Sequence, residues 1–130
     1  MTEIDVEHTR LLNYEMLKEI GALDIKKPKK IIVPGLMDLD IEVLQDDDKT
    51  KVISLAHNYI QNDDLMANPD MVIRIWKGLN EAEALTFQQD NLGVYQEVYT
   101  PKGKANKRLQ KDLNRFLYDW LKNLKEQGFY

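Results

Sequence analysis

The stretch NKRLQKDLNRFLYDWLKNLKEQ, residues 106–127, decides the fold of this 130-residue chain. Its large apolar side chains recur every three or four residues, a spacing that places them on one side of an α-helix. They are Leu109, Leu113, Phe116, Leu117, Trp120, Leu121 and Leu124. Asn106 is a favourable N-cap residue, and Gly128 can end the helix. The pattern predicts a long amphipathic helix whose apolar side must be covered by other elements.

A second helix is predicted near the start of the chain, over residues 9–23. Its expected apolar stripe consists of Leu11, Leu12, Met16, Ile20 and Leu23. Residues 1–8 are expected to form a loose acidic terminus. Residues 24–30 read as a basic connector that leads to a brief strand at residues 30–33.

Between the two helices the apolar period changes to two, which is typical of half-buried strands. Strands are predicted at residues 37–43, 50–60, 71–77, 81–88 and 92–99, whereas residues 61–70 read as a polar loop. In the first hairpin Val43 and Ile53 are expected to face the core, and Glu42 and Lys51 to face water. The sequence therefore predicts a single α+β domain, residues 1–130, with an antiparallel sheet of about five strands and both amphipathic helices packed on it.

The composition of the chain excludes some kinds of chemistry, and its charge is unevenly distributed. The chain has no cysteine, which excludes disulfides and thiolate chemistry, and no apolar run approaches the length of a membrane span. The first ten residues lack the features of a secretory signal, which favours the cytoplasm. The net charge of −4 is uneven, because residues 1–99 carry 10 Lys/Arg and 19 Asp/Glu (−9), whereas residues 100–130 carry 8 and 3 (+5).

Residues 37–128, about 70% of the chain, resemble the YqiB-like family of uncharacterised bacterial proteins. The resemblance rests on residues 72–76 (VIRIW), 82–84 (AEA), Tyr99, 106–109 (NKRL) and 113–121 (LNRFLYDWL). Lys77-Gly78 stands where that family usually has a His-Asp pair. The resemblance implies a bacterial α+β domain, and it implies no activity, ligand or catalytic residue.

Motifs for catalysis or cofactors are weak. The turn Asp46-Asp47-Asp48 lacks the glycine and closing glutamate of a calcium loop, so an exposed hairpin tip is favoured over a metal site. His57 lies in phase with buried strand positions, and a core histidine is favoured over a general base. The scattered glycines form no phosphate-binding loop. No catalytic residue, metal or cofactor is therefore assigned, and a non-enzymatic role is favoured.

Two groups of residues remain as candidate sites. Arg74 and Glu83 face each other if residues 77–80 form a tight turn, and with Gln88 and Tyr99 they form a possible ligand-binding cluster near Trp76. A basic row on one side of the last helix is a possible partner-binding surface; it comprises Lys104, Lys107, Arg108, Lys111 and Arg115.

The favoured function is a non-catalytic binding or adaptor module with an unidentified protein partner or with self-association. The first alternative is a nucleic-acid-binding accessory protein that uses the basic row. The second alternative is a small-molecule binder or enzyme with its site near Arg74, Glu83 and Tyr99.

Overall fold

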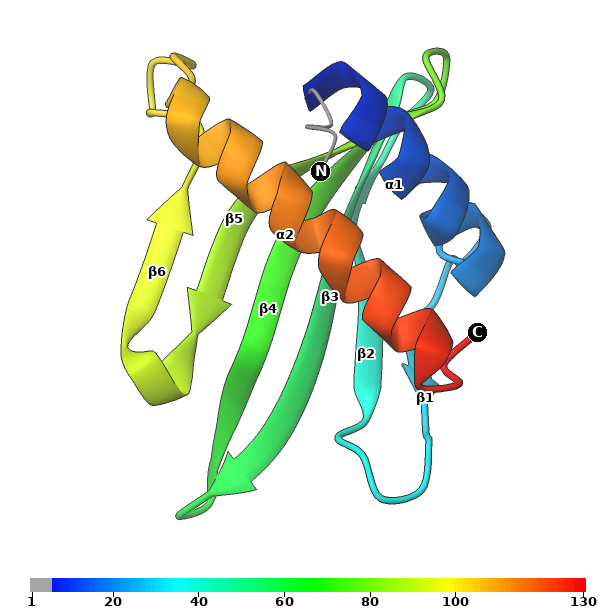
Figure 1. Ribbon diagram of the computed structural model, residues 1–130, viewed down its shortest axis with the longest axis vertical. Coiled ribbons are helices and arrows are strands. Elements are labelled where there is room, and N and C mark those ends of the chain that lie inside the picture. Colours follow the sequence, from blue (N-terminus) through cyan, green and yellow to red (C-terminus); the bar gives the residue numbers. More distant parts are fainter. Residues whose placement is uncertain (1–5) are drawn as a thin grey trace.

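Both helices lie on one face of an antiparallel sheet in the computed structural model, which describes residues 6–130 (Figure 1). These residues form α1 (Val6–Ile20), β1 (Lys29–Ile31), β2 (Leu39–Asp46), β3 (Thr50–Gln61), β4 (Asp64–Trp76), β5 (Glu81–Gln89), a 3₁₀ turn (Asp90–Leu92), β6 (Val94–Glu97) and α2 (Lys107–Glu126). The strands follow one another across the sheet in chain order, β1 to β6, and each neighbouring pair is antiparallel. The predicted α+β fold is thus confirmed, with six strands in the described part of the chain.

The long helix α2 forms where the apolar spacing predicts it. The Asn106 side chain accepts a hydrogen bond from the Leu109 N–H at 3.1 Å, and Gly128 adopts the left-handed φ of +95° just past the end. Most of the predicted stripe is buried, although Phe116 lies at its margin and is 37% exposed. Gln110 and Asn114 are also buried on this side, among the leucines.

The first helix is rotated relative to the prediction and begins earlier. It starts at Val6, so a loose segment reaching residue 8 is wrong for residues 6–8, and residues 1–5 lie outside the described residues. Its buried side carries Thr9, Asn13, Leu17 and Ile20, whereas Leu11 is 45% exposed. On this side Leu17 and Ile20 enter the core, and the Asn13 side chain donates to the Asn114 carbonyl of α2 at 3.1 Å.

The predicted loop at residues 61–70 is instead a hairpin. β3 continues to Gln61, and β4 begins at Asp64. Asn62 and Asp63 join them with φ values of 52° and 68°, the left-handed pair that suits a two-residue turn between twisted strands. Pro69 fits into β4 because the pairing with β3 shifts register between Ala56 and Asn58, where a strand tolerates a residue without an N–H.

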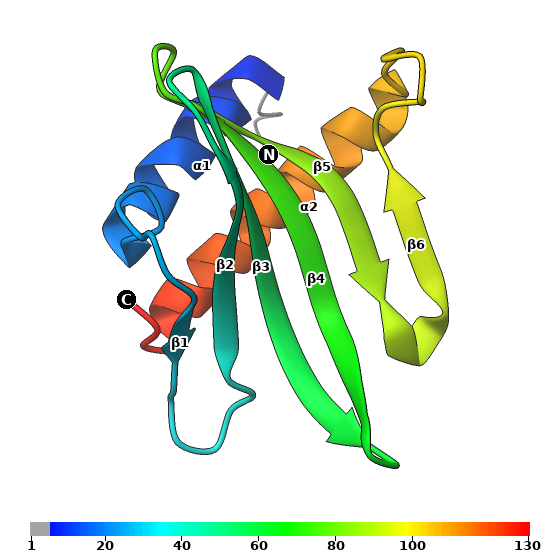
Figure 2. The same cartoon turned by 180° about the vertical axis from the view of Figure 1, so that it is seen from behind.

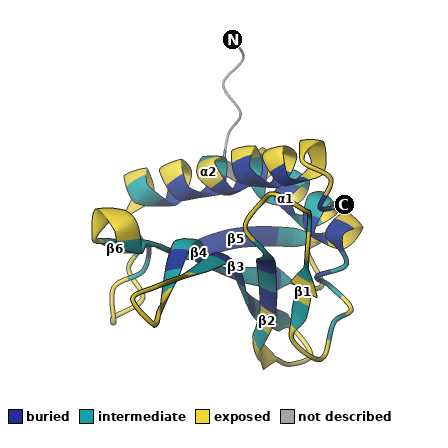
Figure 3. Cartoon of the chain, turned by 90° about the horizontal axis from the view of Figure 1, so that it is seen from below, coloured by how far each residue is buried: buried dark blue, intermediate teal, exposed yellow. Residues whose placement is uncertain are grey.

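The two faces of the sheet have different roles. The covered face supplies the core with apolar side chains from β2 to β5, and these pack against both helices; they include Leu39, Ile41, Ile53, Leu55, Met71, Ile73 and Ile75. Figure 3 shows buried residues where the sheet and the helices face each other. The other face carries no helix, as the view from behind shows (Figure 2). Among residues 6–130, neither helix combines the length and the apolar character that a membrane span requires.

Candidate functional site

A buried carboxylate, Glu83, is the centre of the candidate site. It pairs directly with Arg74 across β4 and β5, as the predicted tight turn requires, and it is 1% exposed. Its Oε1 accepts a hydrogen bond from the Tyr99 hydroxyl at 2.6 Å, and its Oε2 accepts from the Trp76 indole N–H and from Arg10 Nη2 at 3.3 Å. Glu83 therefore joins α1, β4, β5 and the segment that leads to α2.

The edge of β5 beside Glu83 is open, because β6 pairs only with the second half of β5. Their ladder covers only Thr86–Gln89 of β5, so the first half of β5 has an edge that no strand completes. A polar side chain of α2 meets this edge: Asn114 Oδ1 accepts a hydrogen bond from the Ala84 N–H at 2.9 Å. Unpaired buried N–H groups are costly, which explains why an asparagine lies within the apolar stripe of α2.

Arg74 is held between two aromatic rings. Its guanidinium carbon lies 5.3 Å from the centroid of Trp76 and 5.4 Å from that of Tyr99, within the range of cation–π attraction. Its Nε is 3.8 Å from Glu83 Oε2 and makes no hydrogen bond within residues 6–130. Arg74 lies in β4 between Ile73 and Ile75, whose buried side chains face the helices, so its own side chain points to the helix-free face. It is 29% exposed there, although its Nε is buried.

The electrostatics of this cluster are nearly balanced. Arg10 also lies 3.3 Å from Glu81 Oε1, so two guanidinium groups face two carboxylates. Burial and the hydrogen bond to Glu83 raise the pKa of the Tyr99 hydroxyl, which keeps it protonated as a donor. Both carboxylate oxygens of Glu83 are occupied by these donors, so the group is not free to act as a base.

The remaining predicted ligand residue, Gln88, is on the same face but not in the cluster. It pairs with Asp70 of β4 and Tyr95 of β6, and its Nε2 donates to Asp90 Oδ1 at 2.7 Å. Two cluster members, Arg10 and Gln110, escaped the sequence reasoning; Gln110 donates to the Tyr99 hydroxyl at 3.3 Å. The signal for Gln110 was present, since a polar residue on an apolar helix stripe needs a buried partner.

The predicted basic row lies on and before the first half of α2. Lys104, Lys107 and Arg108 are exposed, as is Lys111. Arg115 pairs with Asp119 one turn later at 3.3 Å. The row is therefore accessible to a partner, although its last member is engaged within the helix.

The acidic side chains of the turn between β2 and β3 stabilise the turn itself. Asp47 Oδ1 accepts hydrogen bonds from the N–H groups of Thr50 and Lys49 at 2.8 and 2.9 Å, and these bonds lower the pKa of Asp47. Asp46 Oδ1 accepts from Lys77 Nζ at 2.6 Å, which lowers the pKa of Asp46. The described residues contain no cluster of three His, Cys, Asp or Glu side chains with the geometry to hold a metal ion.

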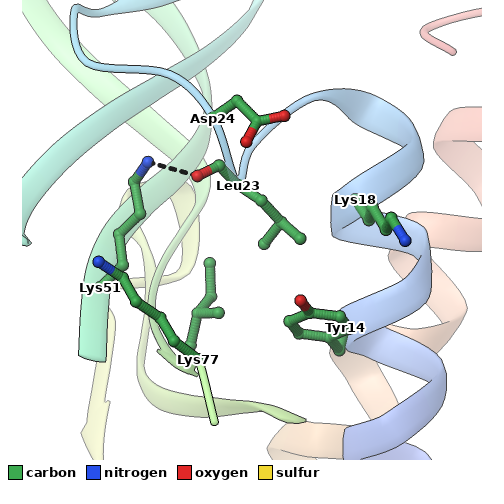
Figure 4. Close-up of a pocket in the computed structure, with 7 residues that line it drawn as sticks. Tyr14, Lys18, Leu23, Asp24, Lys51 and Lys77 are labelled. Atoms are coloured by element: carbon green, nitrogen blue, oxygen red, sulfur yellow. Dashed lines mark hydrogen bonds between the residues drawn. The ribbon is translucent and has the colours of Figure 1, made fainter. Parts of the chain in front are cut away.

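A cavity of about 290 Å³ lies between the C-terminal end of α1 and the sheet (Figure 4). The expectation that Lys51 faces water is wrong, because this side chain is 3% exposed and on the covered face. Its Nζ donates to the carbonyls of Leu23 and Ile25 at 2.8 and 2.6 Å, and burial lowers the pKa of the amine. Lys77 also lines this cavity, and its Nζ donates hydrogen bonds to Asp46 Oδ1 and to the Asp47 carbonyl of the acidic turn. These lysines thus fasten the connector and the turn to the sheet.

The core position expected for His57 is observed. The imidazole lies 5.6 Å from the Trp120 ring and 5.5 Å from the Phe129 ring, and its Nδ1 is 3.2 Å from the Asp38 carbonyl. Burial is the main cause that lowers the pKa of His57, because the charged ring is poorly solvated there.

Acid should therefore weaken the fold through His57. Its folded pKa is below the unfolded value near ~6.5, so the unfolded state binds more protons in that range. The stabilising contribution of the neutral ring is present above about pH 6.5 and is lost as the pH falls toward the folded pKa. We expect the melting temperature to fall between pH 7 and pH 5 in the wild type, and to fall less in His57→Gln. Equal slopes in the wild type and in His57→Gln would contradict this account.

Comparison with known proteins identifies one match. A family model described as a domain of unknown function (DUF6908) matches residues 12–130. No curated protein and no solved structure matched the chain. The family description states no activity, ligand or partner, and it does not mention the YqiB-like family or a bacterial source.

Proposed function

The chain belongs to the DUF6908 family of domains of unknown function, and we propose that it is a non-catalytic binding module whose ligand presents an anionic group to Arg74. The observation that carries the proposal is the position of this guanidinium between the rings of Trp76 and Tyr99 on the face without helices. A positioned arginine loses little side-chain entropy on binding, and charge-assisted hydrogen bonds to it are strong.

The surroundings favour binding over catalysis. Glu83 accepts from Tyr99, Trp76 and Arg10, so the one buried carboxylate near Arg74 already has its partners. The Tyr99 hydroxyl is kept protonated, and His57 is on the opposite, covered face of the sheet. The hollow that contains Arg74 and Trp76 is also bordered by residues 47–50 of the acidic turn, where Asp47 already accepts hydrogen bonds from the backbone of Lys49 and Thr50.

The proposal also covers the domain organisation, the cellular setting and the kind of partner. We propose a single domain over residues 1–130, supported by one hydrophobic core that the sheet and both helices share. A bacterial cytoplasmic setting and a relation to the YqiB-like family are proposed on the motif resemblance. The partner that carries the anionic group is proposed to be a protein, in line with an adaptor role.

Nucleic-acid binding through the basic row is the second candidate function. The observation in its favour is that Lys104, Lys107 and Arg108 are exposed together where α2 begins. Against it stands the acidic remainder of the chain, −9 over residues 1–99, which repels a polyanion.

Titration with small anions tests the Arg74 site directly. We expect N-acetylglycylglycine, which carries a peptide carboxylate, to shift the NMR signals of Arg74 Nε–H and of the Trp76 indole N–H. The corresponding peptide amide should not do so, and phenyl phosphate distinguishes a phosphate source from a carboxylate source. Arg74→Gln should weaken binding by about ten- to hundredfold, the value of one charge-assisted hydrogen bond.

Arg108→Gln is the matched control, because it removes an exposed arginine from the basic row and should leave carboxylate binding unchanged. Carboxylate-induced shifts that survive in Arg74→Gln would refute the proposed site. Salt-sensitive binding of a single-stranded oligonucleotide that Lys107→Glu abolishes would instead favour the second candidate.

A further inference from the structure

A second cavity, of about 300 Å³, lies beside the C-terminal half of α2. It is at the end of β3 and β4 opposite the cavity that Lys51 and Lys77 line. One wall comes from Trp120 of α2 and His57 of β3, and another from Pro69 of β4. The β1–β2 connection contributes Leu36 and Met37, which remain 41% and 39% exposed. Four segments far apart in sequence thus converge on one hollow.

The polar lining of this cavity consists of uncharged groups. Three carboxamides border it, Asn68 from β4, Asn123 from α2 and Gln127 from the C-cap of α2, and no charged residue does. Gln127 follows Asn123 by four residues and keeps a helical backbone conformation, so the two side chains are neighbours at the end of the helix. Within the described residues these three side chains have no hydrogen-bond partner in the protein, and Asn123 and Gln127 are exposed, so their donors and acceptors are available to a ligand.

The walls are held in place by interactions that the rest of the fold supplies. The His57 ring is fixed by the Asp38 carbonyl and packs against Trp120 and Phe129. The pairing of β3 with β4 shifts register here, because Asn68 and Pro69 of β4 lie opposite His57 alone, while His57 still pairs with Leu39 of β2. Such a rigid wall lowers the entropic cost of binding.

We propose that this cavity binds one uncharged heteroaromatic ring that carries amide-type hydrogen-bonding groups, as in a nucleobase or nicotinamide. A charged ligand would lose hydration against a lining that offers it no counter-charge, which disfavours ions. Asparagine and glutamine side chains match the paired donor and acceptor on the edge of such rings. The rings of His57, Trp120 and Pro69 border the cavity and offer apolar contacts to a ring, although the His57 and Trp120 rings are tilted by 58° to each other. The volume, at the lower limit of ligand pockets, suits a small ligand.

Pairs of neutral and charged analogues test the chemistry of the cavity. We expect nicotinamide or adenosine to shift the NMR signals of the three carboxamides and of the Trp120 indole N–H, and to leave the Trp76 indole signal unchanged. Nicotinate and adenosine monophosphate, the charged analogues, should bind at least about tenfold more weakly. Glucose tests whether hydrogen bonding without an aromatic ring is enough, and we expect it not to bind.

Two variants locate the site without disturbing the core. Asn123→Ala and Gln127→Ala change exposed positions of the α2 surface and should leave the melting temperature unchanged. Together they should weaken binding about tenfold, the loss of two hydrogen bonds, whereas Asn91→Ala, at an exposed position outside the cavity lining, should have no effect.

The proposal fails if neither neutral ring produces shifts at millimolar concentration. It also fails if the charged analogues or glucose bind equally well, or if the double variant retains full binding. Ligand shifts confined to Trp76 would assign the ring to the Arg74 face and would overturn the cavity as its site.

Discussion

Replacing Trp120 by alanine should lower the free energy of unfolding by about 3–5 kcal/mol, enough to unfold a domain of ordinary stability at physiological temperature. Trp120 is 7% exposed and lies in the middle of the α2 stripe. Its ring packs 5.6 Å from His57 and 6.3 Å from Phe116. The substitution would remove a large ring from the contact between α2 and the sheet, and the fixed strands could not close the void.

Phe116→Ala provides the comparison for Trp120→Ala. Phe116 belongs to the same helix and touches Phe87 and Trp120, but it is 37% exposed and has less surface to lose from water. We expect a clearly smaller loss for this variant in urea unfolding monitored by circular dichroism. Equal losses, or a Trp120→Ala protein that melts within a degree or two of the wild type, would show that α2 is not anchored through Trp120.

Periodicity predicted the elements whose burial follows from apolar contacts alone. The stripe of α2 and the alternation in β2 and β3 are of this kind, because most of their large apolar side chains are buried on the side that the period predicts, although Leu44, Ile60 and Phe116 remain exposed. The stripe of α1 was misassigned because it included Leu11, which is exposed, and left out Leu17 and Asn13, which are buried; Asn13 donates a hydrogen bond to α2. Such a bond depends on where α2 lies, which no local pattern records.

Lys51 illustrates the same limit for a charged residue. Its position is in phase with Ile53 and Leu55, and alternation alone would have placed it on the covered face. Lysine is rarely buried without partners, which favoured solvent. The deciding factor was the pair of carbonyls at Leu23 and Ile25, which the chain leaves free after α1 ends.

The candidate site was predictable in part. The pairing of Arg74 with Glu83 followed from a tight turn at residues 77–80, since register in a hairpin is set by its turn. The burial of Glu83 could not be predicted from the turn, because it depends on Arg10 and Gln110, which reach the cluster from the two helices. Tertiary placement therefore converts an ordinary cross-strand pair into a buried cluster.

Removal of the Glu83 carboxylate should be the second large effect. Glu83→Leu would leave Arg10 and Arg74 without their shared counter-charge and the Tyr99 hydroxyl and Trp76 indole without their acceptor. Breaking a buried ion pair by deleting one partner costs about 3–5 kcal/mol, because the remaining charge stays desolvated. We expect a loss in this range from urea unfolding. Glu81→Gln, which changes a carboxylate paired with Arg10 alone, should cost much less.

A double-mutant cycle separates the effect of lost charge pairing from the effect of lost side-chain packing. If stranded charge dominates, Arg10→Leu added to Glu83→Leu should restore part of the lost stability, because the pair is then removed together. If the losses simply add, the cluster acts through packing and not through charge. In this double variant Arg74 would be the one guanidinium of the cluster still without the Glu83 carboxylate, so its position between the two rings would be less fixed. The double variant should then bind a carboxylate at Arg74 more weakly than the wild type while remaining folded.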